Sequence, residues 1–133
     1  MSATAHRFLI RVYYEDTDFS GVVYHANYLR FLERGRTEML RERGIDQAAL
    51  FAGPVPFAFA VARMEIDFRK PARMDDALTI ETAVAAIGGA SVTLRQRLLR
   101  GTDLLVEASV KIAAVSQGRA TRLPSTIASR LRA

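Results

Sequence analysis

The chain has 133 residues, of which half are apolar and a quarter are charged, and this predicts one globular domain spanning residues 1–133. It contains no cysteine, which excludes disulfides, thiolate catalysis and cysteine-bound zinc. The net charge of +5 fits either a solvated basic surface or attraction to an anionic partner. We expect no nucleic-acid partner, because the basic residues are scattered and no stacking motif interleaves them.

The N-terminal segment and the apolar runs bear on location. Residues 1–7 are polar and lack the apolar core of a signal peptide. No apolar run approaches the roughly 20 residues that a membrane-spanning helix needs. The sequence therefore predicts a cytoplasmic protein without an integral membrane segment.

The first half of the chain changes from a strand pattern to a helix pattern. Alternating β-forming residues predict a strand over Phe8–Tyr14. From about Asn27 to Gly44 the apolar period is helical, with a stripe made of Tyr28, Phe31, Leu32, Gly35, Met39 and Leu40. We expect Gly35 to let the helix backbone approach a packed sheet closely, and Gly44 to end the helix in the left-handed conformation. Residues Asp46–Phe51 predict a short second helix.

The chain after Pro56 has the pattern of strands joined by tight turns. The predicted strands are Phe57–Arg69, Leu78–Ile87, Ser91–Arg100 and Leu104–Val115. Gly88-Gly89 and Gly101-Thr102-Asp103 are short hairpin signals, and Ser125–Leu131 suits a short terminal helix. The order favours an α+β fold in which a five-stranded antiparallel sheet curls around one long central helix.

The predicted strand Phe57–Arg69 has two unlike faces. Its even positions are all apolar, which predicts one continuously buried face. Its odd positions are apolar in Phe57, Phe59 and Val61 and charged from Arg63 onward. We therefore expect the second face to be covered at its start and hydrated at its end.

The segment Tyr14–Tyr28 gathers the residues best suited to chemistry. Asp16, Asp18, Gly21 and His25 all precede the long helix, whose positive N-terminal end can polarise a carbonyl. An isolated Asp-x-Asp is more often a hydrogen-bonded turn, but this context favours a site. There is no Gly-x-Ser-x-Gly motif, and His6 lies in a segment expected to fray.

This segment continues into Leu29-Arg30-Phe31-Leu32-Glu33-Arg34-Gly35-Arg36. Together they resemble the acyl-CoA thioesterases of the 4-hydroxybenzoyl-CoA thioesterase-like group. Within that group they are most similar to the Tol–Pal-associated bacterial branch. The resemblance spans nearly the whole chain and implies the hotdog fold and hydrolysis of an acyl-CoA thioester. It places the catalytic carboxylate on Asp18 and a histidine near the thioester on His25, while Asp16 is expected to be structural. A histidine at a helix start can equally serve only to hydrogen-bond the backbone, so both roles of His25 stay open. Whether Asp18 attacks directly or activates water stays open.

Substrate-binding residues are expected around the helix start and along the first long strand. Backbone amides near Tyr24, His25 and Ala26 are unsatisfied donors that could polarise the thioester, with Gly21 beside them. The resemblance implies that the strand Phe57–Arg69 pairs with its copy in a homodimer or homotetramer. Possible walls of the acyl pocket are Phe57, Phe59 and Val61, although a role as interface core alone is slightly favoured. Arg69 and Lys70 could meet nucleotide phosphates, although a solvated loop is an equal alternative.

The sequence also bears on three alternatives. A hotdog dehydratase or hydratase usually carries an Asn-Pro pair, which this chain lacks. A non-catalytic acyl-binding module engaging acyl carrier protein would fit the basic charge, but Asp18 and His25 argue against it. A divalent metal on Asp16 and Asp18 has too few ligands, so we expect no metal and no cofactor. The acyl group, short- to medium-chain or aromatic, and its carrier, coenzyme A or acyl carrier protein, stay open.

Overall fold

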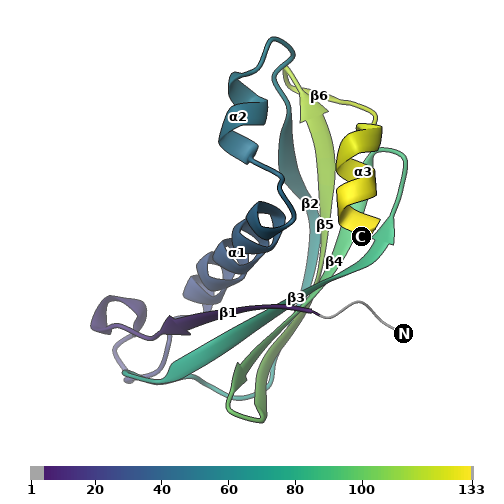
Figure 1. The fold of residues 1–133 in the computed structure, drawn as a ribbon. Helices are drawn as coiled ribbons and strands as arrows, with labels where there is room; N and C mark the ends of the chain where they lie inside the picture. Colours follow the sequence, from purple (N-terminus) through teal and green to yellow (C-terminus); the bar gives the residue numbers. More distant parts are fainter. Residues whose placement is uncertain (1–4, 133) are drawn as a thin grey trace.

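The computed structural model describes residues 5–132, in which antiparallel strands form one sheet curved around a long helix (Figure 1). The strands are β1 (His6–Arg11), β2 (Ala58–Phe68), β3 (Ala77–Ile87), β4 (Ser91–Arg100), β5 (Asp103–Ser116) and β6 (Arg119–Ala120). Their order is β1-β3-β4-β5-β2, with the two-residue β6 paired to β5. The helices are α1 (His25–Glu42), α2 (Gln47–Ala52) and α3 (Ser125–Arg132). Within residues 5–132 no helix is long and apolar enough to cross a membrane.

The long helix α1 packs its predicted apolar stripe against the sheet. All six stripe residues are buried, as the helical period predicted. Gly35 lies so close to β3 that an added Cβ would sit 2.5 Å from Ile80 Cγ2, which confirms the close approach. Gly44 has a φ of +77° and follows the helix end, as predicted. The helix begins two residues earlier than predicted, at His25.

A buried polar cluster lies beneath the middle of α1. Arg36 is 7% exposed, and its Nη1 donates to Gln96 Oε1 at 3.1 Å. Gln96 Nε2 in turn donates to Leu32 O and to Thr82 Oγ1, both at 2.9 Å. Burial lowers the pKa of Arg36, because the charged form loses its hydration. The helical pattern did not mark this arginine as a core residue.

The predicted single buried face of β2 is wrong, because a β-bulge lies between Val61 and Arg63. Directly paired residues share a face, and one extra residue moves the following side chains to the other side. Phe59 pairs with Ala114 and Met64 with Val110, and both partners are buried residues of β5. The face toward α1 is therefore Phe57, Phe59 and Val61 before the bulge, and Met64, Ile66 and Phe68 after it. The outward face begins with alanines and ends with charges.

The first strand is shorter at its C-terminal end than predicted. It ends at Arg11, and Tyr14–Asp16 forms a 3-10 turn in which the Asp16 amide donates to Tyr13 O at 3.0 Å. At its other end the strand includes His6, whose Nε2 lies 3.6 Å from Glu42 Oε2, so the expectation that this residue frays is wrong. The terminal helix α3 packs near the end of α1, where Arg130 Nη1 donates to Gly44 O at 3.0 Å.

Candidate active site

The loop between Asp18 and Val22 is a tight turn that returns the chain to the start of α1. The Asp18 amide donates to Val22 O at 2.8 Å, and the Gly21 amide donates to Asp18 O at 3.2 Å. Gly21 has a φ of +88°, a conformation that favours glycine. An isolated bridge between Thr17 and Val23 closes the base of the loop. The loop therefore presents Asp18 outward on a fixed backbone.

The carboxylate of Asp18 is solvent-exposed and held from one side. Its Oδ1 accepts from the Ser20 amide at 2.8 Å and from Ser20 Oγ at 2.7 Å. These hydrogen bonds, led by that of the Ser20 hydroxyl, lower the pKa of Asp18 below its ordinary value. Within residues 5–132 both hydrogen bonds from Ser20 go to Oδ1, and the Gly21 and Val22 amides lower the pKa further, so Oδ2 is the oxygen more open to a substrate or a water.

The neighbouring Asp16 is buried and fastens the loop to the helix. Its Oδ2 accepts from the Tyr13 amide at 2.8 Å, and its Oδ1 accepts from Asn27 Nδ2 at 2.8 Å. The Tyr24 amide donates to Asp16 O at 2.9 Å. Both carboxylate oxygens are thus occupied, which agrees with the structural role expected for this residue.

The start of α1 leaves backbone donors without a side-chain cap. Tyr24 is the N-cap residue and its side chain makes no capping hydrogen bond. The expectation that the Tyr24 amide is unsatisfied is wrong, because Asp16 O accepts it. The amides of His25 and Ala26 have no acceptor among residues 5–132. No acidic residue lies in the first turn, so the positive end of the helix is not neutralised there.

A cleft of about 250 Å³ opens beside this helix start. Its lining residues are Val23, His25, Tyr28, Phe68, Arg69, Lys70 and Pro71. The His25 ring is exposed and lies against Tyr24, with ring centroids 4.6 Å apart. The structure thus brings together His25, Arg69 and Lys70, three of the residues that the sequence selected, around one cleft. Both cations are already paired, Arg69 with Glu107 at 3.0 Å and Lys70 with Asp103 at 3.1 Å.

The three apolar residues expected around the acyl group lie elsewhere along β2. Phe59 and Val61 line a second cleft of about 120 Å³ between α1 and β2, which also contains Arg36. Phe57 is buried and meets Phe59 edge to face, with centroids 5.2 Å apart. The isolated chain therefore does not join these residues to the cleft that contains His25.

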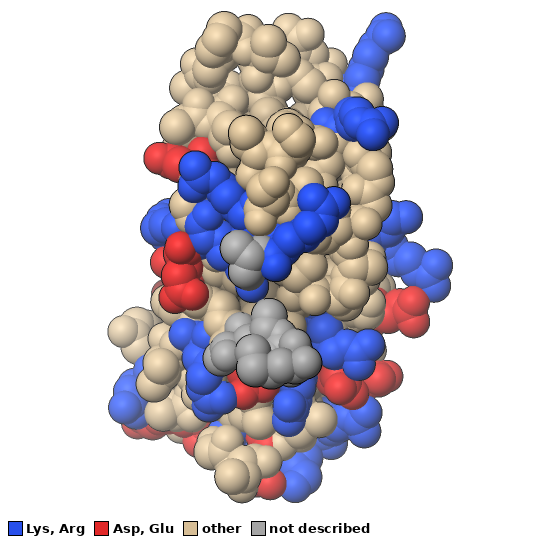
Figure 2. All heavy atoms as spheres, turned by 45° about the vertical axis from the view of Figure 1, so that its right-hand side comes forward, with Lys and Arg blue, Asp and Glu red and all other residues tan. Residues whose placement is uncertain are grey.

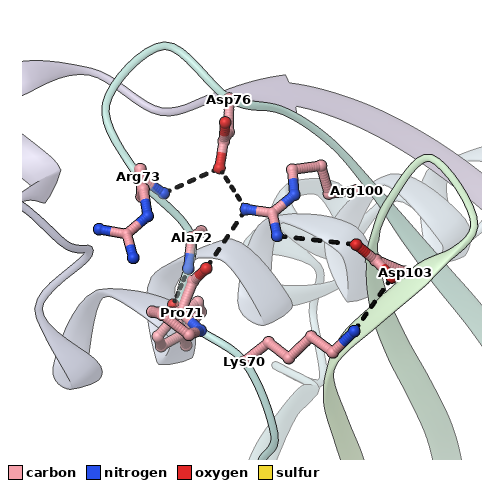
Figure 3. A network of polar contacts seen from close by, with 8 residues as sticks. Lys70, Pro71, Ala72, Arg73, Asp76, Arg100 and Asp103 are labelled. Atoms are coloured by element: carbon pink, nitrogen blue, oxygen red, sulfur yellow. Dashed lines mark hydrogen bonds and ion pairs between the residues drawn. The ribbon is translucent and has the colours of Figure 1, made fainter.

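The site also contains residues that sequence reasoning did not select. Tyr28 is 4% exposed, and its hydroxyl accepts from the Ala72 amide at 2.9 Å. Burial raises the pKa of this tyrosine, so the phenol stays neutral. Ala72 belongs to a network that also includes Arg100 and Asp76 (Figure 3). A buried tyrosine in an apolar stripe gives no sequence signal for such a role. Within residues 5–132 no cluster of three or more His, Cys, Asp or Glu side chains could hold a metal.

A curved antiparallel sheet around one helix, with a carboxylate loop at the helix start, is the architecture of hotdog thioester hydrolases. The Thioesterase superfamily model matches residues 20–107. The acyl-CoA thioesterase YbgC of Haemophilus influenzae is 47% identical over 84% of this chain and 82% of its own. The acyl-CoA thioester hydrolase YbgC of Escherichia coli O6:H1 is also 47% identical, over 86% of this chain and 85% of its own.

Solved structures agree with the sequence comparisons. The crystal structure of a probable thioesterase from Bartonella henselae is 46% identical, with a TM-score of 0.88 over 90% of this chain and 99% of that one. The chain therefore belongs to the thioesterase superfamily and is a thioester hydrolase with the hotdog fold. The predicted family and fold are confirmed, apart from the added strand β6.

Proposed function

We propose that the protein hydrolyses acyl-CoA thioesters to the free acid and coenzyme A, with Asp18 as the catalytic carboxylate. The observation that carries this proposal is the open Asp18 Oδ2 on a loop that ends at the uncapped start of α1. The names of the relatives that are 47% identical support coenzyme A as the carrier. The thioester oxygen would accept from the free amides of His25 and Ala26, where partial positive charge stabilises a developing oxyanion.

Two routes are open to the Asp18 carboxylate. In the first, Oδ2 attacks the thioester carbonyl, the C–S bond breaks, and coenzyme A leaves as a thiolate that takes up a proton. Water then cleaves the mixed anhydride, which restores Asp18 and releases the acid. In the second, Asp18 removes a proton from an attacking water. The lowered pKa keeps Asp18 ionised, as both routes require, and does not favour either one, because lower basicity also makes a carboxylate a weaker nucleophile.

The remaining site residues have supporting roles in this proposal. His25 would orient the carbonyl or assist the leaving thiolate, and Tyr24 and Gly21 shape the loop and the helix start. Arg69 and Lys70 would attract the coenzyme A phosphates, exchanging their partners Glu107 and Asp103 for the ligand. This assignment is supported by their place on the cleft that contains His25.

A second copy of the chain would complete the acyl pocket. β2 ends the sheet, and Val61 is half exposed on this edge. A long apolar edge strand is prone to pair with another strand. We propose that β2 pairs with its copy in a homodimer or homotetramer. The partner would then cover Phe57, Phe59 and Val61 and join their cleft to the thioester site.

The proposal is tested with a panel of acyl-CoAs from short to long and one aromatic ester. Free thiol is followed colorimetrically, against a clean background because the chain has no cysteine. Asp18→Asn should remove nearly all turnover and leave the fold intact. Glu15→Gln is the matched control, since it also neutralises an exposed carboxylate near this loop. Retained turnover in Asp18→Asn would contradict the assignment of Asp18 as the catalytic carboxylate.

An acyl carrier protein is a second candidate carrier, favoured by the distribution of charge. Residues 1–107 contain 14 basic and 14 acidic residues, so the net charge of +5 lies wholly in residues 108–133. Figure 2 shows the molecule turned so that the right-hand side of Figure 1, where α3 lies, comes forward. On this face Lys and Arg side chains outnumber Asp and Glu side chains. An acidic carrier would be attracted to such a face. Turnover of acylated carrier at low salt, lost at high salt, would support this carrier.

A further inference from the structure

The segment that connects β2 to β3 forms one wall of the cleft that contains His25. Its central residue, Ala72, is fully buried and uses both of its backbone polar groups. The Ala72 amide donates to Tyr28 Oη at 2.9 Å, and its carbonyl accepts from the Val23 amide at 2.8 Å. Val22 also bridges to Arg73. Ala72 therefore fixes the strand by which the Asp18 loop returns to α1.

Arg100, the last residue of β4, holds the peptide units on both sides of Ala72 (Figure 3). Its Nη1 donates to Pro71 O at 3.3 Å and to Asp76 Oδ2 at 2.8 Å. The same Asp76 oxygen accepts from the Arg73 amide at 2.9 Å. The Arg100 guanidinium thus binds the Pro71 carbonyl directly. It is linked to the Arg73 amide through the Asp76 carboxylate.

The ion pair at the centre of this network is charged at neutral pH. Burial favours the neutral acid, but hydrogen bonds from Arg100 and from the Arg73 amide still bring the pKa of Asp76 below its ordinary value. The hydrogen bond to Asp76 raises the pKa of Arg100. On the other side, Arg100 Nη2 lies 3.8 Å from Asp103, which also pairs with Lys70. The contacts therefore persist in kinetic measurements near neutral pH.

We propose that Arg100 is a positioning residue for the thioester site, acting through Pro71, Ala72 and Arg73 on the Val23 amide and on Tyr28. This inference rests on the proposed function of the site. Arg100 itself lines neither cleft beside α1, so it acts without touching substrate. A lysine at this position would keep the positive charge but would lack the second nitrogen, Nη2, which lies 3.8 Å from Asp103 Oδ2 while Nη1 holds Pro71 O and Asp76.

The competing interpretation is an ordinary surface ion pair. Arg100 is 33% exposed, and exposed pairs of this kind contribute about 0–1 kcal/mol to stability. Under that interpretation, removing Arg100 would change the unfolding temperature slightly and the rate constants not at all. The two interpretations are separated by kinetics on folded protein.

The kinetic test compares Arg100→Ala and Arg100→Lys with Arg97→Ala. Arg97 is a matched control, because it lies on the same strand and pairs with Glu81 at 3.4 Å, outside this network. We expect Arg100→Ala to lower kcat about 10- to 100-fold with KM within about twofold, since small displacements of positioned groups cost rate. Arg100→Lys should retain an intermediate kcat. A kcat for Arg100→Ala within twofold of the parent, or an equal loss in Arg97→Ala, would overturn the proposal.

Amide hydrogen exchange gives a readout that does not depend on turnover. In Arg100→Ala the amides of Val23 and Ala72 should exchange faster, whereas Arg97→Ala should leave them unchanged. If the Val23 and Ala72 amides of Arg100→Ala exchange at the parent rate, the proposed positioning role of Arg100 is overturned even if Asp18 is catalytic. Conversely, full turnover in Asp18→Asn overturns the proposed site, and faster exchange would then still establish that Arg100 orders this loop.

Discussion

Gly35 of α1 and Ile80 of β3 meet where the helix crosses the sheet. A Cβ added to Gly35 would lie 2.5 Å from Ile80 Cγ2 and 3.3 Å from Gln96 Nε2. Both neighbours are fully buried, so neither can move away freely. The absence of a side chain at this one position lets α1 lie close to the sheet. It thereby helps to set the distance between the sheet and the N-terminal end of α1, which contains His25.

Gly35→Ala is therefore expected to destabilise the protein, although alanine is the better helix former by about 1 kcal/mol. The overlap with Ile80 should cost about 1–3 kcal/mol, as overpacked cores do, and outweigh the helical gain. Urea unfolding measures the net change. In an Ile80→Ala background, which removes Cγ2, the same substitution should cost less. A stabilising Gly35→Ala in the parent chain would contradict the packing argument.

The helix and most strands were predictable because their patterns are local. The α1 stripe repeats with the helical period, and the glycine turns after β3 and β4 separate alternating segments. The bulge in β2 was not predictable, because Ala58, Ala60 and Ala62 satisfy either face and give no signal of where the register shifts. Likewise, Arg36 lies in the helical pattern as a surface charge, and only the partner Gln96, 60 residues later, accounts for its burial.

Gln96→Leu should be strongly destabilising, because it leaves buried groups without partners. The amide of Gln96 accepts from Arg36 and donates to Leu32 O and Thr82 Oγ1. A buried donor or acceptor left unpaired costs about 1–3 kcal/mol, and more for a charged group. We expect a loss of at least about 3 kcal/mol in urea unfolding. Arg95→Ala, on the exposed neighbouring position, should stay within about 0.5 kcal/mol of the parent. Equal effects of the two substitutions would contradict the role of this cluster.

Ser20→Ala should move the acid limb of the activity profile to higher pH. In the proposed mechanism the reaction needs ionised Asp18, so kcat/KM should fall as the pH drops through the pKa of this carboxyl. The Ser20 hydroxyl is the largest cause that holds this pKa below 3.8, and removing it lets the pKa rise toward that value. Profiles of kcat/KM between about pH 3 and pH 6 measure the shift. Ser20→Thr keeps a hydroxyl and should resemble the parent. An unmoved limb in Ser20→Ala would show that another group controls it.

The candidate site was predictable where the chemistry lies within one segment. Asp16, Asp18 and His25 fall within ten residues of one another, so their gathering at the start of α1 follows from the local sequence. The wall of the cleft was harder to predict, because it comes from residues 68–71, which are distant in sequence from the Asp18 loop and are held from the end of β4 by Arg100. Arg100 is one of 19 basic residues, and the antiparallel pairing of β5 with both β4 and β2 brings it to Pro71.

Val61→Lys should break the proposed pairing of two chains along β2. Val61 is 50% exposed at the edge of the sheet, where a lysine charge would be buried on pairing and so disfavours it. Size-exclusion chromatography with light scattering should give an oligomer for the parent and a monomer for Val61→Lys. Thioesterase activity should fall together with the molar mass, because the acyl pocket would lose the partner's wall.

Leu9→Lys provides the control for this change. Leu9 is 73% exposed on β1, at the opposite edge of the same sheet. The substitution therefore introduces the same charge as Val61→Lys, but away from β2. It should leave both molar mass and activity near those of the parent. If Leu9→Lys dissociates the oligomer and Val61→Lys does not, the chains pair along β1. If Val61→Lys becomes monomeric with full activity, a single chain holds the complete site.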